Sequence, residues 1–350
     1  MGAGVVRVAD LDALFAECDR LGGLASPASQ DLLSDFQLQY ETKVDASLDP
    51  FSEAYFDQQV ALYREISRRD LNQAEGEKTH LDVDAHTAGC NPYNIHDVAY
   101  IARHAQVVQT CLVVANLPSS ATVLDLGCGW GLSSEMMAFA GAQVRAVDIN
   151  PMFVELVRKR ATRLGLPIEV VRSDFDHYVD DREYDLVFFY ECLHHSLRPW
   201  VTLNRIRPRV KPGGRLVWAG EPVNDRWWSH WGLRLDYESV FCMRRYGWWE
   251  SGWSAGFISD CFNRCGFALT MIPGLGLDGG PIGFATLNED AGRVKPNLSL
   301  LRGIQAEVTR YKDQLEQFHR EQARMKASLS WRLAAPIRVV GRFLQRSRRA

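Results

Sequence analysis

The chain has 350 residues, of which 46% are hydrophobic and 24% charged, and its formal net charge is −3. This composition is that of a globular protein long enough for one large or two modest domains. The N-terminus has no long apolar run typical of a secretion signal, and no window of about eighteen uncharged apolar residues predicts a membrane span. The eight cysteines form no C-x-x-C pair, which argues against a zinc ribbon or a thioredoxin-like site. We therefore expect a cytoplasmic protein with reduced thiols.

Residues 1–94 are predicted to form a mostly helical N-terminal segment. Apolar side chains recur there at helical spacing, as at Leu11, Leu14, Phe15, Tyr55, Val60, Tyr63 and Ile66. Near its end, the stretch 80–86 alternates His80, Asp82, Asp84 and His86, which would share one face if the segment were extended. Metals require a specific geometry rather than a row, so we interpret these residues as a polar edge and expect no metal.

Residues 95–290 alternate short apolar runs with amphipathic stretches, the pattern of βαβ units on a parallel sheet. Strands are predicted at 122–127, 143–149, 168–173, 184–190, 214–220, 267–272 and 282–287. Residues 222–254 form an insertion after the fifth of these strands, and it holds six of the ten tryptophans interleaved with arginines. Aromatic rings beside arginine suit stacking on a sugar with an anionic group alongside, although a packed core would account for about half of these tryptophans.

Residues 297–329 keep a strict heptad pattern over four repeats, with Leu301, Ile304, Val308, Tyr311, Leu315, Phe318, Gln322, Met325 and Leu329 in the seam. Glu307 and Glu321 occupy g positions, with Lys312 and Lys326 at the e positions five residues later. This pairing predicts a parallel coiled coil and hence a homo-oligomer. A seam that packs on the chain's own globular domain would look the same.

Residues 330–350 form a basic tail. From Gln322 onward there are eight basic residues and no acidic one. The rest of the chain therefore has a formal net charge of −11. Leu333, Ile337, Val340 and Leu344 fall on one helical face, and arginines fall on the other. This layout predicts an amphipathic helix on an anionic membrane, so we expect contact with the inner face of the cell membrane.

A glycine-rich turn follows the first strand of the α/β region, in the stretch VLDLGCGWGLSS. Gly127, Gly129 and Gly131 allow a sharp turn and the close approach of a ligand to the backbone. Asp148 ends the next strand, at about the distance where dinucleotide folds place the carboxylate that binds ribose hydroxyls. The G-x-G-x-G spacing differs from the nicotinamide fingerprint G-x-G-x-x-G.

Five motifs resemble, in order and spacing, those of class I S-adenosylmethionine-dependent methyltransferases over roughly residues 95–290. They are the stretch 123–131, Asp148, the stretch 173–175, the stretch 185–195 and the stretch 210–222. The resemblance implies a Rossmann-like seven-stranded sheet with S-adenosylmethionine at the carboxyl ends of the first strands. The element SLSWRLAAPIR near the C-terminus also resembles tails of bacterial surface-polysaccharide enzymes.

The same resemblance implies the residues that bind the cofactor. Gly127 and Gly129 would flank its methionine part, Asp148 would hold the ribose, and Asp174 with Phe175 would contact the adenine. The full set of expected cofactor residues is Asp125, Gly127, Cys128, Gly129, Gly131, Asp148, Ile149, Asp174, Phe175 and Tyr190.

Methyl transfer to a hydroxyl needs a positioned nucleophile and a group that removes its proton. The stretch YECLHHS after the fourth strand offers Glu191, His194 and His195, and Glu221 ends the fifth strand. His195 is the first candidate for the general base because imidazole titrates near neutral pH. The alternative is that the histidines shape the loop and that Glu221 orients the substrate.

The acceptor is predicted to be a small molecule or a glycan and not a nucleic acid. Amino-methyltransferases that act on DNA bases carry an Asn- or Asp-Pro-Pro-aromatic tetrapeptide after the fourth strand, where this chain has Tyr190-Glu191-Cys192-Leu193. The acidic body agrees with that exclusion. We predict O-methylation of a sugar of a bacterial surface glycan. The alternatives are methylation of a membrane lipid or quinone, and a membrane-associated scaffold that assembles glycan enzymes.

Overall fold

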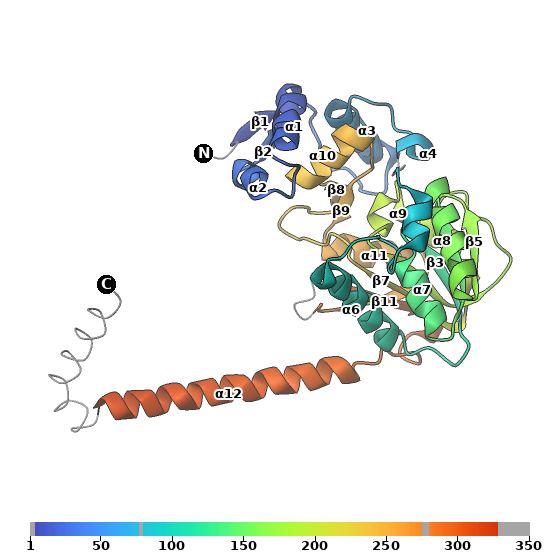
Figure 1. Cartoon of the computed structure of the whole chain (residues 1–350), viewed down its shortest axis with the longest axis vertical. Coiled ribbons are helices and arrows are strands. Elements are labelled where there is room, and N and C mark those ends of the chain that lie inside the picture. Colours follow the sequence, from blue (N-terminus) through green and yellow to red (C-terminus); the bar gives the residue numbers. More distant parts are fainter. Residues whose placement is uncertain (1–3, 77–79, 275–279, 328–350) are drawn as a thin grey trace. The chain divides into compact units, whose positions relative to one another are not determined.

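The computed structural model describes residues 4–76, 80–274 and 280–327. Its contacts divide the chain into two compact units that meet at the bond between Pro296 and Asn297. The first unit is built on a seven-stranded sheet with helices on both faces (Figure 1). The N-terminal segment therefore belongs to the same compact unit as the α/β region. The boundary expected between residues 94 and 95 lies inside that unit.

The predicted seven-stranded sheet is confirmed, in the order β10-β11-β7-β6-β3-β4-β5. Its strands are parallel except β11, which runs antiparallel to β7 and β10. The central strands bury nearly continuous apolar runs, as expected for strands covered on both faces. The bounds are β3 Thr122–Leu126, β4 Gln143–Asp148, β5 Ile168–Arg172, β6 Tyr184–Tyr190, β7 Val210–Ala219, β10 Phe267–Ile272 and β11 Ile282–Leu287.

Strand β7 begins earlier than predicted. The strand was predicted at 214–220, but Val210 already pairs with Tyr184, and the register then shifts before Leu186 pairs with Arg215. Residues 211–214 thus form an irregularity within the ladder instead of preceding it.

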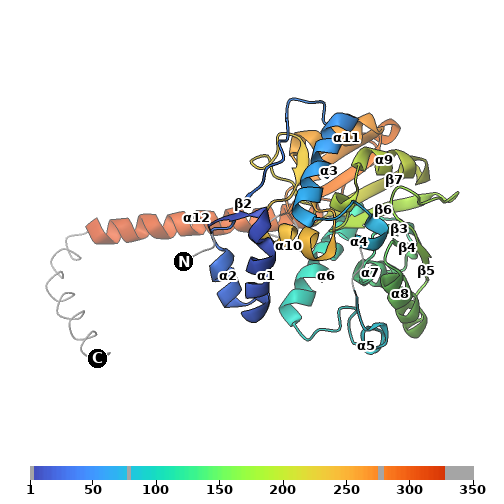
Figure 2. The same cartoon turned by 90° about the horizontal axis from the view of Figure 1, so that it is seen from above.

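Helices cover both faces of the sheet (Figure 2). Helices α6, α7 and α8 lie on one face, and α9 and α11 lie on the other. Helix α6, with a mean hydropathy of 1.2, is long and apolar enough to cross a membrane, which the sequence reading did not expect. Core helices of globular proteins meet the same criterion, and α6 packs against α7 and β7. The bounds are α6 Val98–Ala115, α7 Leu132–Phe139, α8 Pro151–Leu164, α9 Pro199–Ile206 and α11 Ala255–Arg264.

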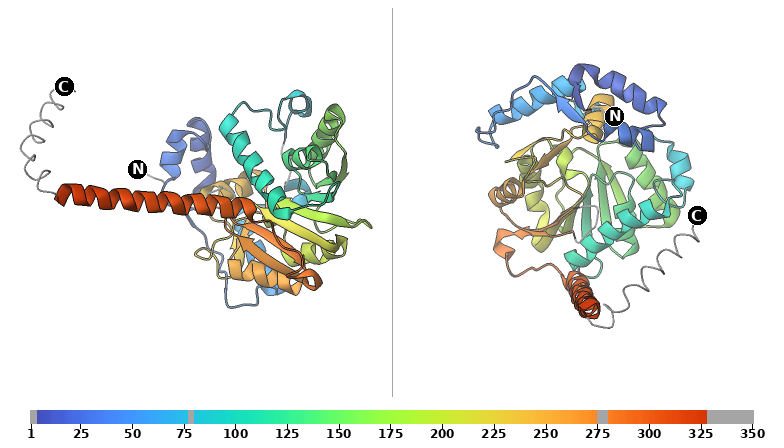
Figure 3. Two further views of the ribbon diagram at one scale, coloured as in Figure 1. Left: turned by 90° about the horizontal axis from the view of Figure 1, so that it is seen from below. Right: turned by 90° about the vertical axis from the view of Figure 1, so that its left-hand side faces the viewer.

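The N-terminal segment and the tryptophan-rich insertion form a joint cap near the sheet (Figure 3). The helices α1, α2 and α3 were predicted as helical, but the short parallel pair of β1 and β2 was not. The insertion contributes the antiparallel pair of β8 and β9 and the helix α10. The bounds are β1 Val5–Arg7, α1 Leu11–Arg20, α2 Pro27–Leu33, β2 Gln37–Gln39, α3 Glu53–Ser67, α4 Gln73–Gly76, β8 Trp231–Leu233, α10 Tyr237–Tyr246 and β9 Ser251–Trp253.

Aromatic contacts and buried hydrogen bonds hold the two parts of the cap together. The Tyr55 hydroxyl donates to the Trp231 carbonyl at 2.5 Å, and the Tyr63 hydroxyl donates to the Gly247 carbonyl at 2.7 Å. The Trp249 ring is fully buried, with centroids 6.0 Å from Phe56 and 5.7 Å from Tyr63. Three of the six insertion tryptophans, Trp231, Trp249 and Trp253, are therefore core residues of the cap.

The row expected in the stretch 80–86 does not form, because residues Val83–Ala88 make the helix α5. Asp82 caps this helix by accepting a hydrogen bond from the Ala85 N–H at 3.0 Å. Asp84 instead pairs with Lys159 of α8. The helix sends these side chains in different directions, so they do not share one face.

The second unit contains helix α12, Ser299–Ala327, which covers most of the predicted heptad seam. Leu329 and the basic tail of residues 330–350 lie outside the described residues, as does the SLSWRLAAPIR element.

Trp249→Ala should lower the free energy of unfolding by about 3–5 kcal/mol, because it opens a cavity between the N-terminal helices and the insertion. Urea unfolding followed by circular dichroism measures this loss. The control is Trp227→Ala, whose side chain is 57% exposed and whose removal should change stability by about 0.5 kcal/mol or less. Equal effects of the two variants would contradict a shared cap core.

Candidate active site

The glycine loop that follows β3 has a backbone conformation that favours glycine. Gly127, Gly129 and Gly131 all have positive φ, at 69°, 49° and 89°. A Cβ at Gly127 would lie 2.8 Å from the Cys192 Sγ, closer than real side chains approach, whereas a Cβ at Gly129 would meet no atom within 4 Å. The loop thus packs against the tip of β6 at Gly127 and leaves space beside Gly129.

Asp148 at the end of β4 holds this loop in place. Its Oδ2 accepts the Gly129 N–H at 2.8 Å, and its Oδ1 accepts the Asn150 N–H at 2.8 Å. A carboxylate offers about four lone-pair sites, so Asp148 can keep both bonds and still accept hydroxyls of a ligand.

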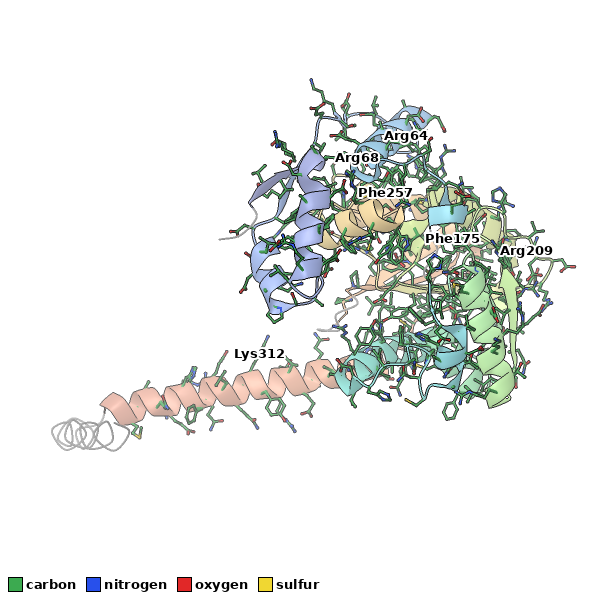
Figure 4. All side chains as sticks on the ribbon, turned by 45° about the horizontal axis from the view of Figure 1, so that its top comes forward. Arg64, Arg68, Phe175, Arg209, Phe257 and Lys312 are labelled. Carbon is green, nitrogen blue, oxygen red and sulfur yellow. The ribbon has the colours of Figure 1, made fainter. Side chains whose placement is uncertain are left out.

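A cavity of about 460 Å³ opens at this carboxyl edge of the sheet. The tips of β3, β4 and β5 contribute one group of lining residues: Gly127, Cys128, Gly129, Asp148, Ile149, Asp174 and Phe175. The tip of β6, the cap, the segment before α6 and the first turn of α6 contribute a second group: Gln73, Tyr93, Tyr100, Tyr190, Glu191, His195 and Trp248. In Figure 4 the labelled Phe175 lies among the side chains of the first unit.

Eight of the ten predicted cofactor residues line this cavity, and Asp125 and Gly131 do not. Asp125 is 1% exposed and accepts hydrogen bonds from the Ser133 and Ser134 hydroxyls at 2.7 and 2.5 Å. Burial raises the pKa of Asp125 to about 6. Its carboxylate therefore anchors the start of α7, and Gly131 caps that helix.

Of the three predicted catalytic residues, only His195 lines the cavity. Glu221 is buried and accepts the backbone N–H groups of Cys192, Leu193 and His194 at 2.9–3.1 Å. It also bonds to the His194 Nδ1 at 2.8 Å. Burial alone would raise the pKa of Glu221, but the His194 ring and the N–H donors hold it below its ordinary value. Glu221 and His194 thus hold the loop together. A loop-shaping role was the alternative for the histidines, whereas Glu221 had been expected to act as a base or to orient the substrate.

The His195 ring is fixed from two sides. Its Nδ1 lies 2.9 Å from the Trp249 carbonyl oxygen, and since a carbonyl only accepts, Nδ1 carries the proton of the neutral ring. The ring is 4.3 Å from that of His194 and 5.9 Å from that of Trp248, measured between centroids. The Gln73 side chain donates to the His195 carbonyl at 2.6 Å. The cap therefore holds His195 with Nε2 as the basic nitrogen.

Glu191, which the stretch YECLHHS also offered, lines the cavity but was not among the three predicted catalytic residues. It has a φ of 53°, which is strained for a residue other than glycine, and its side chain is 45% exposed. Burial raises the pKa of its carboxyl group. Strain and a shifted pKa often occur together at functional sites. The glutamate three residues before His194 was visible in YECLHHS, but its backbone conformation was not.

His194, His195 and Glu250 form a group with ligand atoms within 4.8 Å of one another, a composition that metal sites share. Protein contacts account for this group. The Glu250 Oε2 lies 3.6 Å from the His194 Nε2 and 3.5 Å from the Arg234 Nη1. Arg234 thus supplies positive charge beside Glu250, and we assign no metal to the group.

Comparison with known proteins identifies the α/β core. A family model described as "Methyltransferase domain" matches residues 124–218. These residues form a methyltransferase domain. The match contains the glycine loop, Asp148, Asp174, Phe175 and His195.

Two curated relatives each resemble part of this chain. The "Ubiquinone biosynthesis O-methyltransferase, mitochondrial" of Schizosaccharomyces pombe is 37% identical over 105 residues, 29% of this chain and 38% of that protein. The "Ubiquinone biosynthesis O-methyltransferase" of Xanthomonas axonopodis pv. citri is 38% identical over 101 residues, 28% of this chain and 42% of that protein. The chain thus spans about two fifths of the length of these relatives.

Solved structures with similar topology include a glycopeptide N-methyltransferase complexed with sinefungin, with a TM-score of 0.43 and 12% identity, covering 53% of this chain and 86% of that one. Another is an S-adenosylmethionine-dependent methyltransferase from Clostridium acetobutylicum, with a TM-score of 0.41 and 11% identity, covering 53% and 92% of the two chains.

The cavity of the methyltransferase domain fits S-adenosylmethionine as cofactor. At Gly127 the backbone alone borders the cavity, and any side chain there would collide with Cys192. Asp148 presents a carboxylate for the ribose hydroxyls, and Phe175 presents a ring for the adenine, with Asp174 beside it.

Asp148→Ala should weaken the binding of S-adenosylmethionine by about 1.5–3 kcal/mol, the range for hydrogen bonds to a charged group. Isothermal titration calorimetry on the folded variant measures the change. Asp181→Ala is the matched control, because Asp181 is exposed and lies outside the cavity. Unchanged affinity in Asp148→Ala would remove Asp148 from the site.

Glu221→Gln should destabilise the fold at neutral pH by about 1.5–3 kcal/mol, because its carboxylate accepts four hydrogen bonds. The pKa of Glu221 is below the unfolded value of 4.5, so this stabilisation is present above that pH and is lost as the pH falls through the folded pKa. The variant should accordingly show a weaker loss of stability in acid. Urea unfolding from about pH 3 to pH 7 tests this, with the exposed Glu155→Gln as control.

Proposed function

We propose that this protein transfers a methyl group from S-adenosylmethionine to a hydroxyl group on a ring-shaped acceptor. The observation that carries the proposal is that one cavity joins the glycine loop and Asp148 to His195. Cofactor-binding groups and a base at one cavity are what methyl transfer to oxygen requires.

The bound cofactor would supply the electrophilic methyl group, and the chain's residues would do the rest. His195 removes the acceptor's hydroxyl proton through Nε2, since its Nδ1–H donates to the Trp249 carbonyl. The imidazolium that forms keeps that hydrogen bond. Trp248 lies beside His195, and Tyr93 and Tyr100 line the same cavity. These rings keep water from the reacting oxygen.

Two acceptor classes suit the second group of lining residues. A hydroxylated quinone or phenol would stack on the aromatic rings, and the names of the curated relatives favour this class. A sugar of a surface glycan would use the same rings together with the Glu191 carboxylate and Gln73, which accept and donate hydrogen bonds to ring hydroxyls. The lining residues suit both classes, and the names of the relatives favour the quinone-like acceptor, so we place it first.

A scaffold without catalytic activity is the remaining alternative. The shape of the cavity argues against it, because a scaffold has no use for a strained Glu191 and an oriented His195 beside a cofactor site.

Wild-type protein should release methylated product from labelled S-adenosylmethionine with at least one member of a panel of hydroxylated quinones, phenols, nucleotide sugars and glycan fragments. His195→Ala should lower that rate by about a hundredfold at neutral pH, because it removes the general base. The affinity for S-adenosylmethionine should stay unchanged, since His195 belongs to the acceptor side.

His319→Ala, on the exposed surface of α12, is the matched control and should keep full activity. A rate within two- or threefold of wild type in His195→Ala would make His195 structural, and Glu191 would become the base to test, since Glu221 lies outside the cavity. Cofactor binding without turnover on any class of acceptor would favour the scaffold.

A further inference from the structure

Helix α12 carries a row of large apolar side chains that the helix itself leaves exposed. Their exposed fractions are 42–60%. They are Ile304, Val308, Tyr311, Leu315 and Phe318, and we call them the α12 seam. Such a row on a helix of 29 residues is unfavourable in water unless another surface covers it.

The spacing of the α12 seam indicates what kind of surface covers it. Its members alternate four and three residues apart, so Val308 and Leu315 occupy a positions, and Ile304, Tyr311 and Phe318 occupy d positions. A helix that packs on a globular core carries apolar residues at a and d and also at e or g. In α12 the flanking positions Gln305, Glu307, Lys312, Gln314 and His319 are polar. The stripe is therefore as narrow as the seam of a coiled coil.

The charges beside the seam match a second copy of the same helix. Glu307 is at a g position, and Lys312 is at the e position five residues later. In a parallel, in-register pair, Glu307 of each helix faces Lys312 of the other. Lys312 stands out from α12 in Figure 4. Gln322 is a polar residue at an a position, where it meets its own copy and favours one register.

We propose that α12 pairs with the α12 of a second copy of this chain as a parallel, in-register coiled coil. Within the described part of the chain, the residues that line the cavity all belong to residues 1–296, so none of them comes from α12.

The full-length protein should be a dimer at micromolar concentration by size-exclusion chromatography with light scattering. Leu315→Glu buries an unpaired carboxylate in the seam and should raise the dimer dissociation constant on the order of a hundredfold or more. Its affinity for S-adenosylmethionine should equal that of the wild type, which shows that the variant is folded. A monomeric wild type, or a Leu315→Glu variant that stays dimeric, overturns the proposal.

Charge exchange tests the pairing of Glu307 with Lys312. Glu307→Lys should weaken the dimer, because it places like charges opposite each other, and Glu307→Lys combined with Lys312→Glu should restore it. Failure of the double variant to restore dimerisation contradicts this pairing.

An introduced cysteine tests orientation. Val308 is away from the middle of α12, so Val308→Cys meets its own copy only in a parallel, in-register pair and should form a disulfide-linked dimer on mild oxidation. Asp313→Cys lies on the outer face and should not form this disulfide. Because Cys90 is also exposed, the unchanged protein is oxidised in parallel to measure cross-linking through Cys90. A dimer that does not cross-link through position 308 rules out the parallel register.

Discussion

The buried carboxylate of Glu221 is the constraint on which the site depends. It sits just beyond β7 and collects the backbone N–H groups of the loop that leaves β6. A buried charge is tolerated only when it is well satisfied, so the loop can adopt few other conformations while Glu221 is ionised. That loop contains Cys192, which closes on the glycine turn, and His195, which faces the cavity. One side chain therefore couples the glycine turn to His195.

The sequence predicted the sheet well because buried strands leave a strong local pattern. All seven strands were placed, and eight of ten cofactor residues line the cavity. The site residues that were predicted to line the cavity but do not were misjudged in the direction of their side chains. Asp125 and Glu221 were correctly expected at the carboxyl edge, but a position in the chain does not reveal whether a side chain points to the cavity or into the protein. The cap could not be derived, because its aromatic core forms between segments almost two hundred residues apart, and no local pattern records such contacts.

Several residues that line the cavity lie outside the part of the chain that matches the methyltransferase family model. The family match covers residues 124–218, which hold the cofactor residues and the β6 tip. Gln73, Tyr93, Tyr100 and Trp248 line the cavity from outside that region. Under the proposed function, acceptor choice would depend on these four residues, which lie outside the family match.

The cap also sets an order of events during synthesis. Tyr55 of α3 bonds to Trp231, 176 residues later. At ribosomal rates of about 5–20 residues per second, roughly ten to thirty-five seconds pass between the synthesis of Tyr55 and that of Trp231. During this time the apolar face of α3 has no insertion to pack against. Contacts so distant in sequence also slow folding, because a long loop must close before they form. The N-terminal helices are therefore the part of the nascent chain that most needs protection by a chaperone.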